Sequence, residues 1–233
     1  MTMIYPIRIN KYLAEKKICS RREADELIKN GKIIINGKVA ELGEMVLESD
    51  EVVVDGNLKK LVYLAYNKPK GVVTHTGQEG ETSISDIIKL DTDVYPLGRL
   101  DKDSRGLILL TNDGRVTDKL LNPIYSHDKE YIVKVNKFID ENFENEMING
   151  VQIGGGYKTK KCVFKKIDDF TFSIILIEGK NRQIRNMCKV LGFGVVDLKR
   201  VRVMNVELND LKQGRYRVIN NEELDKFLTD LGL

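Results

Sequence analysis

The chain has 233 residues, of which 42% are hydrophobic, and a formal net charge of +3. This composition is sufficient to bury a core in one large or two smaller domains. No apolar run is long enough to span a bilayer, and the first ten residues lack the apolar segment of a signal peptide. We therefore expect a cytoplasmic protein with no membrane partner.

Cysteine and histidine are too sparse to suggest a metal centre. The three cysteines are isolated and lack CxxC spacing, which argues against a disulfide framework or a zinc site. His75 and His127 are too few and too far apart for a metal site or a Ser-His triad. The run 154–156 of three glycines lacks the strand-turn-helix context of a phosphate loop. We expect chemistry that needs neither metal nor cofactor.

Positive charge is clustered along the chain. Lysine and arginine gather within residues 8–38, 158–166 and 180–202, whereas residues 139–146 are acidic. Clustered cations interleaved with apolar residues favour a polyanionic partner, whose binding releases counterions.

The first 55 residues predict a small module of two helices and a hairpin. A helix over 9–16 places Ile9 and Leu13 at helical spacing. In the second helix, Ser20 and Glu23 form a capping box, and Gly31 ends the helix. A strand over 32–36 then leads through Asn36-Gly37, a two-residue hairpin signal, to residues 38–40.

The motifs of residues 9–14, 19–24 and 34–38 resemble the S4 RNA-binding domain, and we assign residues 7–55 to it. Arg21 and Arg22 project from the first turn of the capped helix, where backbone amides already favour anions. These two arginines are our candidates for phosphate contacts. The polar residues 56–61 read as a linker.

Residues 62–233 predict an α+β domain with a mixed, largely antiparallel sheet. We expect strands over 61–66, 107–110, 131–135, 170–177, 195–198 and 201–208, and helices over 84–88, 116–121, 141–148, 182–191 and 222–231. Within this domain, Asp101 lies on a loop just before the apolar strand 107–110, and Asn112-Asp113-Gly114 ends that strand. Such a loop holds a side chain rigidly while leaving it accessible.

Residues 97–114 also resemble the signature of the pseudouridine synthases that modify ribosomal RNA, the RsuA family, which implies that Asp101 is the nucleophile. The segment 67–73 resembles an early motif of that family, and its Pro-Gly turn could direct Lys68 and Lys70 toward an anion. Asp101 and Asp103 together could instead suggest a two-carboxylate glycosidase. Carboxylates this close in one loop rarely attain the opposed geometry that such an enzyme needs.

Two later motifs complete the expected site. Side chains alternate between the two faces of strand 129–135, so Tyr131 points to the same face as Val133 and Val135. Glu130, Ile132 and Lys134 point to the other face. The resemblance implies that Tyr131 stacks on the target base near the proton that leaves carbon 5. In segment 178–188 it implies that Arg185 pairs with Asp101; an opposite charge would keep the carboxylate ionised inside a closed pocket.

Three further cations complete the candidate RNA contacts. They are Arg99, Lys180 and Arg182. Arg99 lies two residues from Asp101, on its side of an extended segment, and we rank it as a backbone or phosphate contact.

Within the family, residues 159–162 and 181–188 look most like the F-type large-subunit enzymes. This implies isomerisation of a uridine in 23S ribosomal RNA, near the peptidyl-transferase region, by base flipping and an aspartate-dependent, cofactor-free reaction. The alternatives are the same reaction on 16S ribosomal RNA or transfer RNA, and a non-catalytic ribosome-assembly factor that works through its S4-like module. A monomer is our default expectation.

Overall fold

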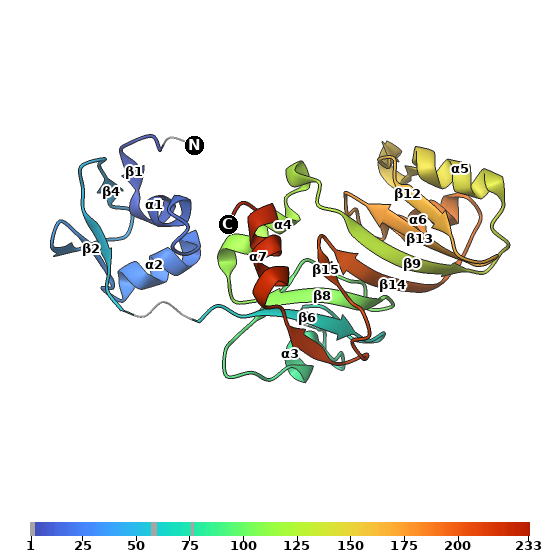
Figure 1. The fold of residues 1–233 in the computed structure, drawn as a ribbon, viewed down its shortest axis with the longest axis horizontal. Helices are drawn as coiled ribbons and strands as arrows, with labels where there is room; N and C mark the ends of the chain where they lie inside the picture. Colours follow the sequence, from blue (N-terminus) through green and yellow to red (C-terminus); the bar gives the residue numbers. More distant parts are fainter. Residues whose placement is uncertain (1–2, 57–59, 76) are drawn as a thin grey trace.

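The computed structural model describes residues 3–56, 60–75 and 77–233, and it folds into two domains that lie side by side (Figure 1). The predicted linker over 56–61 therefore falls partly outside the described residues. The N-terminal domain contains two helices and two small sheets. These elements are β1 (Ile7–Arg8), α1 (Ile9–Glu15), α2 (Arg21–Lys29), β2 (Ile33–Ile35), β3 (Lys38–Val39), β4 (Met45–Val46) and β5 (Val52–Val54).

The local signals of this domain are confirmed. The Ser20 hydroxyl accepts from the Glu23 amide at 3.3 Å, and the Glu23 carboxylate accepts from the Ser20 amide at 2.8 Å. Asn36 and Gly37 both have positive φ, 49° and 79°, as a type I′ hairpin turn requires. Ile9 and Leu13 pack with residues of α2 and β2 in a separate hydrophobic core.

The second domain is built on one long sheet, which Figure 1 shows running through its length. The strand order is β12-β13-β9-β14-β8-β6-β16, with β15 on β14 and β7 on β8. The strands are β6 (Tyr63–Lys68), β7 (Tyr95–Leu97), β8 (Arg105–Thr111), β9 (Lys129–Val135), β12 (Val163–Lys166), β13 (Thr171–Leu176), β14 (Val195–Val203), β15 (Val206–Glu207) and β16 (Tyr216–Val218). All pairs are antiparallel except β14 with β8, so the expected mixed, largely antiparallel sheet is confirmed.

Helices and short turns cover the sheet. They are α3 (Ile84–Ile87), α4 (Gly114–Leu121), α5 (Glu141–Asn149), α6 (Gln183–Val190) and α7 (Asn221–Asp230), with 3-10 turns at Pro123–Tyr125 and Gly154–Gly156. Helices α5 and α6 bury Phe143 and Met187 against β9 and β13, whereas α4 and α7 bury Val116 and Phe227 in a second cluster. None of the helices in the described ranges is long and apolar enough to cross a membrane.

The boundary expected between the strands 195–198 and 201–208 is wrong. Residues Val195–Val203 form a single strand, β14, and only Val206–Glu207 turns back as β15. Lys199 and Arg200, between the two expected strands, continue β14, and Arg200 is buried. The glycine run at 154–156 lies between β10 (Gln152–Ile153) and β11 (Tyr157–Lys158), which pair as a hairpin.

A glycine permits the single parallel pairing. Gly106 on β8 has φ +106°, and a Cβ built there would lie 2.2 Å from the Arg200 carbonyl oxygen. Only a residue without a side chain allows the two backbones to approach so closely. Gly106 therefore fixes where β14 joins the sheet, and with it the position of Arg200.

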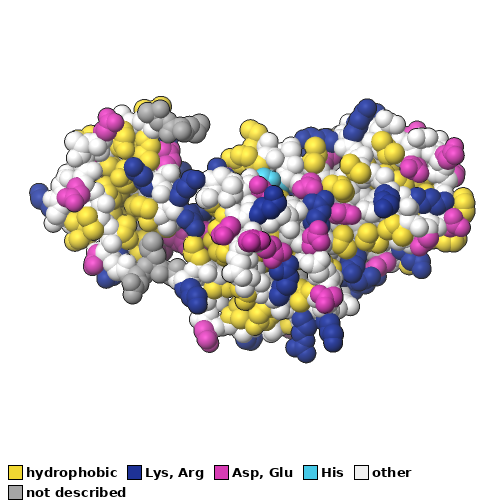
Figure 2. Space-filling view, viewed as in Figure 1, with side chains coloured by type: hydrophobic (Ala, Val, Ile, Leu, Met, Phe, Trp, Pro, Cys, Tyr) yellow, Lys and Arg dark blue, Asp and Glu magenta, His cyan; other side chains and the backbone are white. Residues whose placement is uncertain are grey.

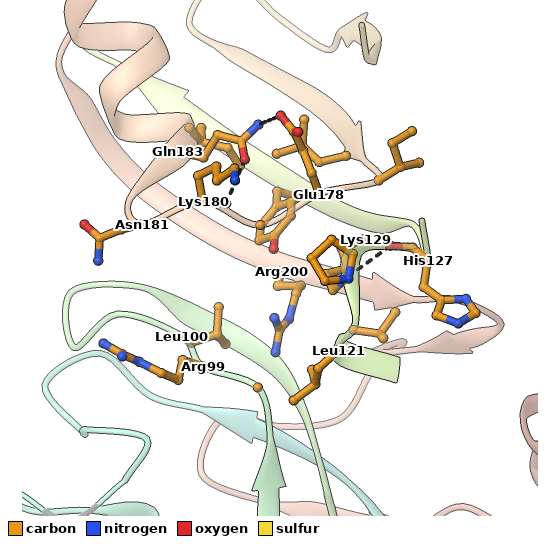
Figure 3. Close-up of a pocket in the computed structure, with 18 of the residues that line it drawn as sticks. Arg99, Leu100, Leu121, His127, Lys129, Glu178, Lys180, Asn181, Gln183 and Arg200 are labelled. Atoms are coloured by element: carbon orange, nitrogen blue, oxygen red, sulfur yellow. Dashed lines mark hydrogen bonds between the residues drawn. The ribbon is translucent and has the colours of Figure 1, made fainter. Parts of the chain in front are cut away.

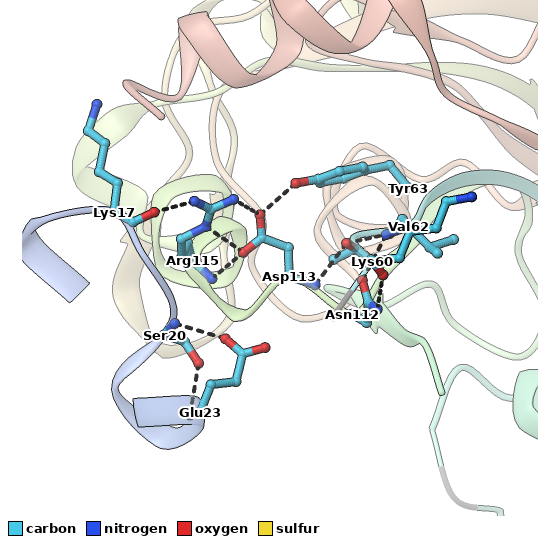
Figure 4. Close-up of polar contacts among 10 residues, drawn as sticks. Lys17, Ser20, Glu23, Lys60, Val62, Tyr63, Asn112, Asp113 and Arg115 are labelled. Carbon is cyan, nitrogen blue, oxygen red and sulfur yellow. Dashed lines mark hydrogen bonds and ion pairs between the residues drawn. The ribbon is translucent and has the colours of Figure 1, made fainter. Parts of the chain in front are cut away.

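Arg115, which pairs with buried Asp113 in the second domain, also joins the two domains (Figure 4). Arg115 of α4 donates to Asp113 at 2.7 and 2.8 Å and also to the Lys17 carbonyl of the N-terminal domain. Asp113 also accepts from the Tyr63 hydroxyl at 2.6 Å. Burial works to raise the pKa of Asp113, but the bonds from Arg115 and Tyr63 outweigh it and hold that pKa below its usual range.

Candidate active site

Asp101 lies on the loop between β7 and β8, as expected. The Ser104 amide donates to the Asp101 carbonyl at 3.0 Å, which closes a turn around the carboxylate. The segment after β6 braces this turn, because Thr74 exchanges hydrogen bonds with the Leu100 backbone at 2.7 and 3.0 Å and the Gly71 amide donates to the Lys102 carbonyl at 2.8 Å. The Asp101 side chain is half-buried, with 28% of its surface exposed.

A cavity of about 430 Å³ opens beside this loop, and Figure 3 shows several of the residues around it. Asp101 and Tyr131 both line this cavity. Its volume falls within the range of small-molecule sites, about 300–1,000 Å³. Tyr131 is partly buried and packs against the cluster that contains Val133 and Val135, so its predicted orientation is confirmed. The cavity therefore combines a carboxylate on one wall with an aromatic ring that can pack against a base.

The expected pair of Arg185 with Asp101 needs correction. Arg185 donates to the Asp103 carbonyl and the Ser104 hydroxyl, both at 3.1 Å, and its guanidinium lies 3.4 Å from the Asp103 carboxylate. The arginine near Asp101 is Arg182, at 3.7 Å, which also binds Asp103 at 2.9 Å. Arg185 lies in the first turn of α6 and reaches only the end of the loop. It therefore ties α6 to the loop that carries Asp101.

The expectation that Lys68 is directed toward an anion also needs correction. The Lys68 side chain is fully buried, and its ammonium group donates to the carbonyls of Pro69 at 2.9 Å and Val72 at 2.7 Å. Burial lowers the pKa of Lys68 to about 8, although Asp101 and Asp103 act in the opposite direction. Because no surface of this side chain is accessible, Lys68 supports the turn and does not contact RNA. Lys70 is exposed and pairs with Asp197 at 2.7 Å.

Three of the predicted RNA contacts meet at the cavity. They are Arg99, Lys180 and Arg182, and all three are exposed residues of its rim. Buried Glu178 organises the loop that carries two of them, since it accepts from Gln183 at 2.7 Å and from the Lys160 amide at 3.0 Å. Gln183 in turn accepts from the Lys180 amide at 2.9 Å. These bonds hold the basic loop over the cavity.

Arg21 and Arg22 do not lie at this cavity. Both are exposed on the first turn of α2, where the sequence placed them. Figure 2 shows Lys and Arg side chains on the edge of the N-terminal domain that faces its neighbour, and again across the second domain. A long polyanion could contact both groups.

Sequence reasoning missed two cations on the cavity wall, Lys129 and Arg200. Arg200 is 4% exposed and pairs directly with Tyr131 in the β14–β9 register. Lys129 lies two residues before Tyr131 on β9, so all three share one face of the sheet. Burial and the nearby Arg200 charge lower the pKa of Lys129 to about 8. The same two-residue alternation that placed Tyr131 could have found Lys129.

Within the described residues, no group of three or more histidine, cysteine or acidic side chains could hold a metal ion. Cys19, Cys162 and Cys188 are all free thiols. The chemistry available at the cavity is that of one accessible carboxylate, one tyrosine and several cations.

Comparison with known proteins identifies related chains. The family model for RNA pseudouridylate synthase matches residues 62–189, and the S4 domain model matches residues 7–52. The chain is 45% identical to the dual-specificity RNA pseudouridine synthase RluF of Escherichia coli (strain K12), over 94% of this chain and 77% of that protein. It is 35% identical to the ribosomal large subunit pseudouridine synthase B of Bacillus subtilis (strain 168), over 94% of each.

A solved structure agrees with these matches. The crystal structure of a pseudouridylate synthase superimposes with a TM-score of 0.70 at 26% identity, covering 97% of this chain and 99% of the other. The similarity therefore extends over both domains.

Proposed function

Because the chain belongs to the RNA pseudouridylate synthase family and carries an S4 domain, we propose that it converts a uridine of 23S ribosomal RNA to pseudouridine, near the peptidyl-transferase region. The observation that carries this proposal is the cavity in which Asp101 and Tyr131 meet beneath a rim of cations. Relatives named for ribosomal large-subunit RNA support the choice of substrate. The reaction needs no cofactor.

In this proposal each group has a defined role. The target uridine leaves its stack, at a cost of a few kcal/mol that stacking and cation contacts offset. Asp101 acts on the nucleotide, the glycosidic bond from nitrogen 1 breaks, the base rotates, and carbon 5 bonds to the ribose. Tyr131 packs on the base near the proton that carbon 5 loses. Arg185 and Arg182 keep the loop of Asp101 in place.

RNA binding is divided between the domains. Residues 7–55 form the RNA-binding module, in which Arg21 and Arg22 contact phosphates, and residues 62–233 form the catalytic domain. Arg99, Lys180 and Arg182 contact the RNA around the flipped nucleotide, and Lys70 contributes from the neighbouring turn. One chain carries all of these groups, so a monomer is sufficient for the reaction.

The test is to incubate the wild-type protein and Asp101→Ala with unmodified 23S ribosomal RNA and map pseudouridine by carbodiimide-dependent primer-extension stops. We expect a stop near the peptidyl-transferase region with the wild-type protein alone. Transfer RNA and 16S RNA serve as parallel substrates, since one relative is named for dual specificity. Tight binding without a stop on any RNA would instead favour the assembly-factor function.

A further inference from the structure

Arg200 is a buried cation whose charge has no carboxylate partner among the described residues. Its Nε donates to the Leu107 carbonyl at 2.6 Å, and this is the only hydrogen bond of the Arg200 side chain within residues 3–56, 60–75 and 77–233. The other two guanidinium nitrogens have no such partner, and Figure 3 shows the guanidinium directed toward the side of the cavity where Leu100 and Leu121 lie. A buried charge without a partner is costly unless a ligand compensates it.

Lys129 places a second cation on the same wall. Its ammonium group donates to the His127 carbonyl at 3.0 Å, and the cavity is lined by both Lys129 and Arg200. Five lysine and arginine side chains line this cavity, against only two carboxylates. One of those carboxylates, Glu178, is already occupied by Gln183 and Tyr157. The inner wall is therefore built for a ligand that carries negative charge.

The position of Arg200 distinguishes between the phosphate and the base of a nucleotide. Backbone phosphates remain strongly hydrated, and the exposed rim cations Arg99, Lys180 and Arg182 are available to them. Arg200, in contrast, is 4% exposed and is the direct cross-strand partner of Tyr131. A base that packs on Tyr131 would lie against Arg200, whereas the phosphates would stay at the rim.

We propose that Arg200 is a further catalytic residue, which donates hydrogen bonds to a uracil oxygen while the base is detached from the ribose. This inference rests on the proposed function. When the bond between nitrogen 1 and the ribose breaks, its electron pair remains on the base, and the negative charge spreads to the uracil oxygens. Arg200 stabilises that charge, and Lys129 adds to the positive potential. The charge is discharged when carbon 5 bonds to the ribose, the carbon 5 proton leaves and nitrogen 1 is protonated.

The test compares Arg200→Met with Lys180→Met on RNA that carries tritium at carbon 5 of uridine. It measures single-turnover tritium release and the salt dependence of binding. Loss of a donor to a developing oxyanion costs about 10²–10³-fold in rate. We expect Arg200→Met to lose that much at saturating RNA with an unchanged salt slope. Lys180→Met, at the rim, should lower the slope by about 0.7–0.9.

Lys129→Met provides a second variant in case Arg200→Met does not fold, because it removes a cation that burial already disfavours. It should slow tritium release at saturating RNA in the same way, although by less. A normal rate with a reduced salt slope in Arg200→Met, or a normal rate in Lys129→Met where Arg200→Met is unfolded, overturns the inference. Failure of the wild-type protein to release tritium from any RNA would overturn the proposed function itself.

Discussion

Single residues at the cavity show how burial decides the role of a cation. Lys68 and Lys70 are two residues apart and looked equivalent in the sequence, yet one is fully buried and the other exposed. The resemblance to the family implied that Asp101 and Tyr131 share one site, and both line the same cavity. Residue type and spacing could not predict which arginine approaches Asp101, because that depends on how the loop before α6 places Arg182 and Arg185.

The role of Lys68 can be tested by salt titration of RNA binding. Lys68→Met should leave the slope of log Kd against log salt unchanged, since a buried ammonium group neutralises no phosphate. Lys180→Met is the matched variant on the rim, and it should reduce the slope by about 0.7–0.9. A reduced slope for Lys68→Met would return this residue to the RNA contacts.

The depressed pKa of Lys129 predicts a pH-dependent effect on stability. Its pKa is about 8 in the folded protein and near 10.5 when the chain is unfolded, so the unfolded state binds more protons between these values. The wild-type protein therefore gains stability from this group as pH rises from 8 to 10.5, and Lys129→Met does not. We expect the stability of Lys129→Met relative to wild type to fall by up to about 3 kcal/mol over this interval.

Urea unfolding of both proteins at pH 7, 8.5 and 10 measures this difference. Lys129→Arg is the control, because its guanidinium remains charged throughout. The stability of Lys129→Arg relative to wild type should therefore change with pH in the same direction as that of Lys129→Met. A difference that is constant with pH would mean that Lys129 titrates normally.

Elements with strong local signals were predicted well, whereas elements that depend on distant partners were not. The capping box of α2 and the Asn36-Gly37 turn lie within a few residues of the structure they specify. We expected a break at Lys199 and Arg200, but β14 continues through both, and Arg200 is buried beside Tyr131 on the cavity wall. Short edge strands such as β12 and β16 carry too few apolar residues to be recognised.

The close approach of β8 and β14 can be tested by substituting Gly106. Gly106→Ala would force a Cβ within 2.2 Å of the Arg200 carbonyl oxygen at a positive φ, and it should cost about 3 kcal/mol or more. Gly154→Ala is the matched control, because no atom lies within 4 Å of its added Cβ. Thermal unfolding measures both, and equal melting temperatures would show that the two strands can separate without cost.

At the scale of the whole molecule, the contact between the domains sets where the RNA-binding module lies relative to the cavity. Helix α2, which carries Arg21 and Arg22, packs on α4 of the catalytic domain. A Cβ added at Gly114 would lie 2.5 Å from the Ser20 side chain. The sequence predicted both domains, but this contact joins residues about ninety positions apart, and no local pattern reveals it.

Gly114→Ala tests whether this contact holds the domains together. The three atoms nearest to the new methyl group belong to Ser20 and Glu23 of the N-terminal domain, so we expect each domain to stay folded while the two separate. Small-angle X-ray scattering should show a larger radius of gyration. Ser20→Gly combined with Gly114→Ala removes the obstructing side chain at a capping cost of only about a few tenths of a kcal/mol, and it should restore the compact form. An unchanged radius in the single variant would show that the contact does not restrain the domains.

We propose that Asp101 performs uridine isomerisation in the cavity beside Tyr131. Tritium release from RNA labelled at carbon 5 of uridine tests it most directly, because the carbon 5 proton leaves only when the new glycosidic bond forms. We expect release by the wild-type protein, none by Asp101→Asn, and slower but measurable release by Asp103→Asn, whose carboxylate binds Arg182. Equal release by Asp101→Asn and the wild-type protein would show that isomerisation does not need Asp101.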